Sequence, residues 1–202
     1  MRFPHEAKFF EPLNAQMELL TEGSRLLWEG AQLGAAGMRK CSERIEELRQ
    51  ETGELYIRIV ADLRRTLITP IDPEDILRLS ASMKRLCDTL ARAASRQEFC
   101  ACQPAPPELL QKLELIHQCS RSLGSAFGSF RNGALPRHCE ELRELSERAS
   151  RIARDAREKL LESDSAPIAV MRLRETYDLA HVVLTRYVDL SETLKRVKLK
   201  NG

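Results

Sequence analysis

The sequence has few aromatic residues, almost no net charge and no long apolar run. Tryptophan, tyrosine and phenylalanine make up 5% of its 202 residues, and 32 basic residues nearly balance 30 acidic ones to give a net charge of +2. Such a chain creates no strong field toward nucleic acid or an anionic membrane, so we expect no nucleic-acid partner. Only the extreme C-terminus is locally basic, and there we favour a solvated helix end.

Segments that would place the chain in a membrane or export it are also missing. No stretch approaches the roughly 18 consecutive apolar residues of a membrane span. The opening residues, MRFPHEAKFFEPL, lack the apolar core and the small-residue cleavage site of a secretory signal. We therefore expect a cytoplasmic protein that reaches a membrane only through a partner.

Sequence motifs of enzymes are absent as well. The chain contains no glycine-rich phosphate loop, no nucleotide-binding motif and no spacing typical of a Ser-His-Asp triad. His181 has neither a nucleophile nor a carboxylate at a fixed local spacing, which favours a packed or partly exposed histidine over a catalytic base or a ligand. We predict a protein that is not an enzyme and that binds no cofactor.

The six cysteines are typical of a reducing compartment. Four of them fall within helical patterns, where a thiol behaves as a small apolar side chain: Cys41, Cys87, Cys119 and Cys139. The Cys100-Ala-Cys102 pair suggests an alternative, a zinc site completed by His117, Cys119, His138 and Cys139. Because Cys-x-Cys alone is a weak signal, we favour loop thiols with no ligand role.

Apolar residues recur at alternating spacings of three and four along most of the chain. The first of six such series is Leu13, Met17, Leu20, Ser24, Leu27 and Ala31, and the others begin at Cys41, Ile76, Leu109, Leu142 and Leu173. This spacing places one side chain per turn on a single stripe, which must be buried against other helices. No alternating run indicates a strand, so we predict an all-α protein.

The breaks between these series have recognisable helix signals. Gly34 and Gly37 flank the first break, and the second is the stretch TPIDPED at residues 69–75. Within it Asp72 is a suitable N-cap, Pro73 fits the first helical position, and acids follow in the first turn. We interpret this stretch as a corner that ends one long helix and begins the next.

The layout then repeats after the proline-rich connector at residues 103–107. Pro167 stands 97 residues after Pro70, and the same shift takes Ile45 to Leu142. In the first helix of each half the best shift is 96, as from Leu13 to Leu109. We predict an elongated six-helix bundle made of two repeated three-helix units, residues 1–102 and 103–202, in a single structural domain.

The corner and the end of the chain carry a family resemblance. A long helix ending in TLITPIDPEDI, and a second three-helix unit closing on RETYDL and VDLSETLKRVKLKNG, resemble the PhoU-like proteins, in particular the divergent branch associated with Pit-type inorganic phosphate transporters. The resemblance covers nearly the whole chain and is most specific at Thr-Pro-Ile-Asp-Pro-Glu-Asp and the final Lys-Asn-Gly. It implies a non-enzymatic helical protein that regulates phosphate uptake.

The resemblance also implies metal sites, since members carry Glu/Asp-x-x-x-Asp motifs that bind iron or zinc clusters. Carboxylates at i and i+4 share one helix face and supply hard oxygen ligands. In this chain the eight motif positions, counted from the corner prolines, are Arg49, Gly53, Lys84, Asp88, Ser146, Ser150, His181 and Thr185. Only Asp88 is acidic, and the acid pair Glu47 and Glu51 stands two residues out of register. We therefore predict that the metal cluster is absent.

Two alternatives remain for the basic replacements. The first is that Arg49, Lys84 and Arg85 line a site for an anion such as phosphate, held by charge-assisted hydrogen bonds. The simpler interpretation is ordinary solvated helix charge, with Glu51 and Glu54 as neighbouring partners. Trp28 and the Phe9–Phe10 pair raise a similar choice between a docking surface and, as we favour, core packing.

Two functional classes follow. The first is a regulatory or accessory protein of inorganic phosphate transport that contacts a Pit-type transporter at the cytoplasmic face of the inner membrane. The second is a general helical adaptor or scaffold that has lost both metal binding and phosphate-related function. The sequence leaves a homo-oligomer open, and it favours the first class on resemblance alone.

Overall fold

The computed structural model describes residues 4–100, 105–128, 135–161 and 166–201, and every regular element in these ranges is a helix. The elements are α1 (Pro4–Arg65), α2 (Pro73–Phe99), α3 (Pro107–Gly128), α4 (Leu135–Leu161) and α5 (Pro167–Asn201). The predicted all-α class is confirmed. The predicted boundary between residues 102 and 103 lies outside the described ranges.

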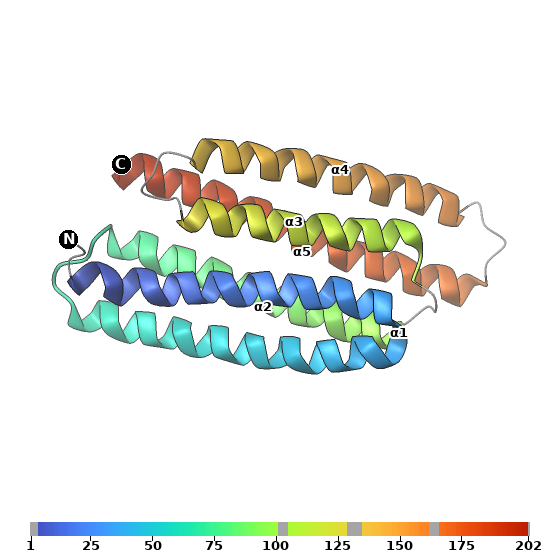
Figure 1. The fold of residues 1–202 in the computed structure, drawn as a ribbon, viewed down its shortest axis with the longest axis horizontal. Helices are drawn as coiled ribbons and strands as arrows, with labels where there is room; N and C mark the ends of the chain where they lie inside the picture. Colours follow the sequence, from blue (N-terminus) through green and yellow to red (C-terminus); the bar gives the residue numbers. More distant parts are fainter. Residues whose placement is uncertain (1–3, 101–104, 129–134, 162–165, 202) are drawn as a thin grey trace.

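A sharp bend at Gly34 divides α1 into two helical segments that run antiparallel to each other (Figure 1). Gly34 has φ 78° and ψ −168°, a conformation that is essentially restricted to glycine. The chain then passes so close to itself that a Cβ added to Gly37 would lie 2.2 Å from the Cβ of Leu33. The bend therefore falls at the predicted break, and six helical segments result from five continuous elements.

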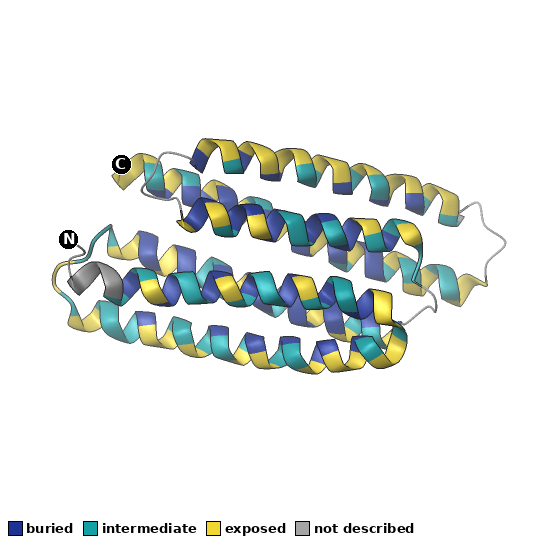
Figure 2. Cartoon of the chain, viewed as in Figure 1, coloured by how far each residue is buried: buried dark blue, intermediate teal, exposed yellow. Residues whose placement is uncertain are grey.

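The helices form an elongated bundle with two sides (Figure 1). Both segments of α1 pack with α2 on one side, and α3, α4 and α5 pack together on the other. Contacts between α1 and α3 and between α2 and α5 join the sides. Buried residues line the faces that meet, whereas the outward face of α4 is largely exposed (Figure 2).

The core follows the predicted apolar stripes. All six residues of the series from Leu13 to Ala31 are buried, as are all six of the series that begin at Ile76 and Leu109. The exceptions are half-buried: Leu55, Leu145, Ile152 and Leu173. The four helical cysteines are buried as predicted, and Phe9 is fully buried. Trp28 and Phe10 pack against the core, which agrees with the packing role favoured from sequence.

The contacts between α1 and α3 reflect the repeat. Ser24 Oγ lies 3.1 Å from His117 Nδ1, and Ser120 Oγ donates to Thr21 Oγ1 at 3.2 Å. The predicted shift of 96 makes Thr21 equivalent to His117 and Ser24 equivalent to Ser120. Each bond therefore joins a serine of one half to the residue of the other half that stands three positions before the equivalent serine. The first helices of the two halves therefore meet through equivalent surfaces.

No helix in the described part of the chain is both long enough and apolar enough to cross a bilayer.

The bend at Gly34 provides a stability test. Gly34→Ala should lower the free energy of unfolding by about 1–3 kcal/mol, because an alanine must adopt a backbone conformation that its Cβ disfavours. The control is Gly53→Ala, since a Cβ there meets no atom within 4 Å and alanine is the better helix former. Urea unfolding should show opposite changes for the two variants, and equal changes would contradict this account of the bend.

Candidate functional site

The corner between α1 and α2 is capped as the sequence predicts. Asp72 is the N-cap of α2, its Oδ1 accepts a hydrogen bond of 2.9 Å from the Glu74 N–H, and Pro73 takes the first helical position. Asp75 follows with a side chain that is only 2% exposed. The corner therefore places one carboxylate at the helix end and buries a second one just behind it.

The end of α5 meets this corner across 128 positions of sequence. Lys200 Nζ lies 2.6 Å from Asp72 Oδ2 and 3.2 Å from Asp75 Oδ2, and Asn201 Nδ2 donates to Asp75 Oδ2 at 3.3 Å. The Lys200 ammonium and the Glu74 N–H lower the pKa of Asp72. The two stretches on which the family resemblance rests thus form one hydrogen-bonded junction.

The basic motif positions lie in and beside an open polar groove formed by the second segment of α1, α2 and α5. Its volume is ≈ 730 Å³, and its charged lining is Glu46, Arg49, Asp88, Arg92, Arg96 and Glu175. Arg49 Nε donates to both carboxylate oxygens of Glu46 at 2.9 Å, and its Nη1 lies 3.6 Å from Asp88 Oδ1. Lys84 Nζ lies 3.0 Å from the other oxygen of Asp88. Both predicted cations therefore converge on the single acid retained at the motif positions.

These residues do not fit a metal cluster. The Asp88 carboxylate is shared between a guanidinium and an ammonium, and hydrogen bonding to Arg49 lowers the pKa of Glu46 by stabilising its ionised form. Two fixed cations repel a metal ion from the oxygens that would have to bind it. Within the described ranges no three His, Cys, Asp or Glu side chains gather as a ligand set.

The structure brings together only two of the three predicted anion-binding residues. Arg85 is exposed and its Nη2 donates to Ser82 Oγ at 3.0 Å, whereas Arg49 and Lys84 share Asp88. Because Glu46 and Asp88 already offset the charge of Arg49 and Lys84, the groove is not a cluster of uncompensated cations. Anion binding by Arg49, Lys84 and Arg85 stays a prediction.

Glu51, one of the two acids expected beside the three cations, does not pair with Arg49. Glu51 binds Arg44 at 2.8 Å, Glu47 binds the same guanidinium at 2.9 Å, and Arg49 turns to Glu46 instead. Side chains two positions apart on a helix do not face each other, and Glu51 is two positions from Arg49. Gly53, the other motif position on this helix, has open space where a Cβ would stand.

The motif positions of the second half gather no carboxylates. Ser146 and Ser150 on α4 are half-buried, whereas His181 and Thr185 on α5 are largely exposed. The Thr185 hydroxyl donates to the His181 carbonyl oxygen at 3.1 Å, and partial burial together with Lys112 and Arg157 lowers the pKa of His181. This half therefore offers no set of oxygen ligands at the motif positions.

A buried lysine near His181 is the polar feature that sequence reasoning missed. Lys112 on α3 is 0% exposed, and its Nζ donates to the Tyr177 carbonyl oxygen at 3.3 Å. Burial, reinforced by the nearby positive charge of Arg157, lowers the pKa of Lys112 to about 7. The signal was present in the sequence, because position 112 falls three after Leu109 and four before Ile116, on the apolar stripe itself.

The two halves treat this position differently. The shift of 96 aligns Lys112 with Gln16, which is equally buried. Gln16 Nε2 donates to the Thr52 carbonyl oxygen at 3.1 Å, and Ser80 Oγ donates to Gln16 Oε1 at 2.8 Å. The Gln16 amide of the first half thus has both a hydrogen-bond donor and an acceptor as partners. The second half instead buries the amine of Lys112.

The residues of the alternative zinc site are dispersed. Cys100 is the buried C-cap residue just after α2, and Cys102 lies outside the described ranges. His117 stacks on Trp28 with ring centroids 6.0 Å apart and faces Ser24. His138 Nδ1 lies 3.7 Å from Glu141 Oε2. The rings of His117 and His138 thus contact groups other than the cysteines.

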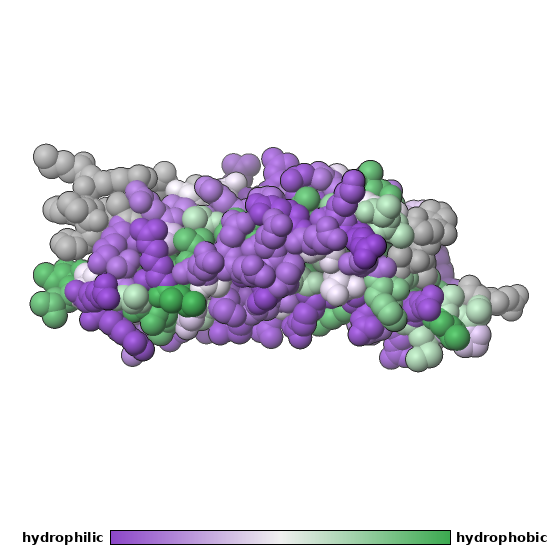
Figure 3. Space-filling view, turned by 90° about the horizontal axis from the view of Figure 1, so that it is seen from below, coloured by the Kyte–Doolittle hydropathy of each residue, from purple (hydrophilic) through white to green (hydrophobic). Residues whose placement is uncertain are grey.

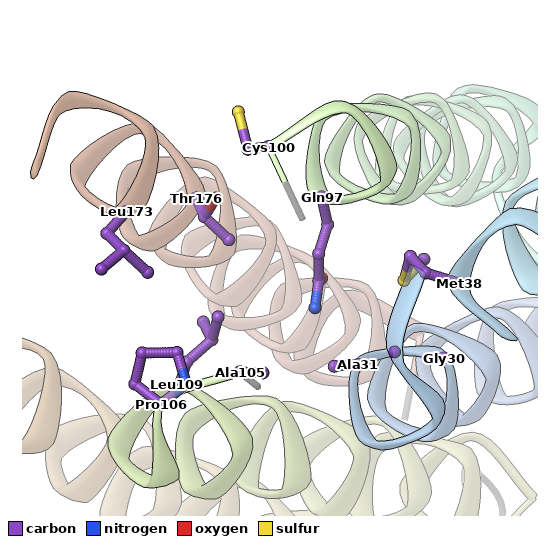
Figure 4. A pocket seen from close by; sticks show the side chains of 11 residues that line it. Gly30, Ala31, Met38, Gln97, Cys100, Ala105, Pro106, Leu109, Leu173 and Thr176 are labelled. Atoms are coloured by element: carbon purple, nitrogen blue, oxygen red, sulfur yellow. The ribbon is translucent and has the colours of Figure 1, made fainter. Parts of the chain in front are cut away.

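A small cavity at the bend of α1 does not provide a ligand site. Gln97 from α2 points into it, and Met38, Leu109 and Thr176 are among the other residues that line it (Figure 4). Its volume of ≈ 20 Å³ suits a single water molecule. Phosphate or any larger metabolite is excluded by size.

Two crystal structures from Shewanella oneidensis MR-1 share this architecture. A PhoU-like protein matches with a TM-score of 0.77 at 17% identity, covering 95% of this chain and 98% of that one. A candidate PhoU-like phosphate regulatory protein matches with a TM-score of 0.73 at 16% identity, covering 94% and 98%. The fold is that of the PhoU-like proteins. The predicted fold class is therefore confirmed along almost the entire chain.

Sequence comparison gives a weaker match. UPF0111 protein YkaA of Bacillus subtilis (strain 168) is 20% identical over 154 residues, which are 74% of this chain and 75% of YkaA. No protein-family model matches the chain. The PhoU-like fold is thus established by structure.

Lys112 makes the stability of this PhoU-like fold depend on pH. The unfolded chain keeps the lysine protonated up to about pH 10.5, whereas the folded protein releases the proton near pH 7. The unfolded state binds more protons in that window, so stability should rise with pH there by at most about 1.4 kcal/mol per unit.

Lys112→Met should remove this dependence and raise the free energy of unfolding most at pH 7 and below, as measured by urea denaturation from pH 6 to pH 9. The exposed Lys40 supplies the control Lys40→Met. A parallel pH profile for wild type and Lys112→Met would show that Lys112 is not the titrating group.

The junction between α5 and the corner can be tested separately. Lys200→Met should lower the free energy of unfolding by about 1–3 kcal/mol, because the buried Asp75 carboxylate loses a charged partner. The matched control is Lys195→Met, which breaks only an exposed pair with Glu192 and should change stability by less than about 0.5 kcal/mol. Equal losses in chemical denaturation would contradict a special role for Lys200.

Proposed function

We propose that this chain is a non-enzymatic PhoU-like regulator of inorganic phosphate transport. The observation that carries the proposal is the match of 95% of the chain to a PhoU-like structure, with the family's corner and terminal stretches joined by Lys200. The second structural neighbour is described in terms of phosphate regulation, which supports the same physiological setting. Membership of the branch associated with Pit-type transporters is part of the proposal.

The proposed mode of action is direct contact between proteins. The acids in the groove are already paired with the chain's own cations, Glu46 with Arg49 and Asp88 with Lys84, which supports action without a metal cluster. The small cavity at the bend of α1 has room for no more than a water molecule. The long polar faces and the helix corners are then the surfaces through which the protein acts.

The proposed partner is a Pit-type inorganic phosphate transporter, contacted at the cytoplasmic face of the inner membrane. A rigid bundle with balanced surface charge suits binding by shape and paired charges over an extended area. A general adaptor without phosphate-related function is the alternative, and it differs in predicting soluble partners. Oligomerisation is compatible with either.

The decisive experiment is affinity purification of the tagged full-length chain from solubilised native membranes. We expect a phosphate permease to be enriched over a control bait of another tagged helical bundle. Recovery of unrelated soluble proteins alone would favour the adaptor. In parallel, deletion of the gene should change the rate of radiolabelled phosphate uptake, and unchanged uptake across low and high phosphate would contradict the regulatory role.

A further inference from the structure

The corner between α1 and α2 projects two aliphatic side chains from one end of the bundle. Leu67 is 103% exposed and Ile68 is 75% exposed. Leu199, in the last turn of α5 at the same end, is 85% exposed. Figure 3 shows apolar side chains at the left-hand end, where the corner lies, whereas the middle of that face is largely hydrophilic. We call Leu67 and Ile68 the apolar tip.

Hydrogen bonds flank the apolar tip on both sides. Lys8 Nζ donates to Thr66 Oγ1 at 3.1 Å just before the tip, and Thr69 Oγ1 donates to the Ile71 carbonyl oxygen at 2.7 Å just after it. Beyond these bonds Lys200 anchors Asp72 to α5. Because the corner is already ordered, docking would cost little conformational entropy.

Basic side chains flank the apolar tip. Arg64 and Arg65 occupy the last turn of α1 and are both exposed. On α5 the exposed Arg196 donates to the backbone oxygen of Glu192 rather than to a carboxylate. The corner's own acids Asp72 and Asp75 are offset by Lys200 and Arg78, and Glu74 adds one further negative charge. The end of the bundle therefore combines protruding aliphatic groups with an excess of cations.

From this combination we propose that the apolar tip docks onto an anionic lipid bilayer. A convex pair of aliphatic side chains inserts into a deformable interface without a preformed pocket, and flanking arginines bind lipid phosphates. A second copy of the chain is a poorer occupant, because a symmetric contact through this end brings Arg64 and Arg65 toward the same residues of the other copy. Direct lipid contact differs from the expectation that only a partner brings the chain to a membrane.

This inference does not depend on the phosphate-related function, and protein-free vesicles test it alone. The full-length protein is sedimented with vesicles of phosphatidylcholine containing phosphatidylglycerol and with vesicles of phosphatidylcholine only. We expect binding to the anionic vesicles that weakens with salt. Leu67→Ser/Ile68→Ser should reduce the partition coefficient by about tenfold or more. Arg64→Gln/Arg65→Gln should reduce it by about fivefold for each arginine removed.

Two matched variants control for general changes in hydrophobicity and charge. Ile168→Ser/Met171→Ser removes two exposed apolar side chains, 65% and 71% exposed, from the opposite end of the bundle. Arg151→Gln/Arg154→Gln removes two exposed arginines from α4. Both should bind anionic vesicles like the wild type. Circular dichroism of every variant confirms that the helices are intact.

A spectroscopic readout reports on the apolar tip directly. In Leu67→Trp the new indole should shift its emission to shorter wavelength when anionic vesicles are added, against the constant background of the core-packed Trp28. Absence of binding to anionic vesicles overturns the proposal. Equal losses of vesicle binding in the tip and control variants also overturn it. So does binding of Leu67→Trp to anionic vesicles without any shift in its emission.

Discussion

The contact of the first segment of α1 with α3 and α5 is the constraint on which the rest of the bundle depends, since it joins the two halves along the middle of the molecule. Tyr187 is fully buried there, and its hydroxyl donates to the Leu20 carbonyl oxygen at 3.1 Å. The bonds of Ser24 with His117 and of Ser120 with Thr21 lie in the same interface. Buried polar groups must find partners, so these few bonds fix the register in which the apolar stripes meet.

The exterior shows how a PhoU-like fold is maintained without carboxylate pairs at the motif positions. Arg49 and Lys84 stand where the resemblance implies acids, and they are held by Glu46 and Asp88. The result is a groove in which Arg49, Lys84 and Arg96 each pair with an acid, and such exposed pairs add little to stability. Such a surface can change sequence freely while the core preserves the fold, which explains how identities of 16–17% accompany nearly complete structural coverage.

The two halves have diverged most informatively at one buried position. Gln16 is satisfied as a neutral amide by Thr52 and Ser80, whereas Lys112 has the Tyr177 carbonyl oxygen and a pKa lowered to about 7. Polar side chains buried in a helical core fix which surfaces pair, at a cost in stability. Both halves therefore have a buried polar side chain at this position, but only the lysine of the second half can gain or lose a proton.

The sequence by itself determined the helices, their apolar stripes, the capped corner at Asp72 and the repeat, because each depends on local spacing or backbone preference. The burial of Lys112 could also have been predicted from the sequence, since this lysine lies at a helical spacing on an apolar stripe. Only the tertiary structure decided that Arg49 and Lys84 share Asp88, and that Lys200 closes onto a corner 128 residues away. Those contacts depend on how helices rotate and slide against one another, and no local pattern encodes that geometry.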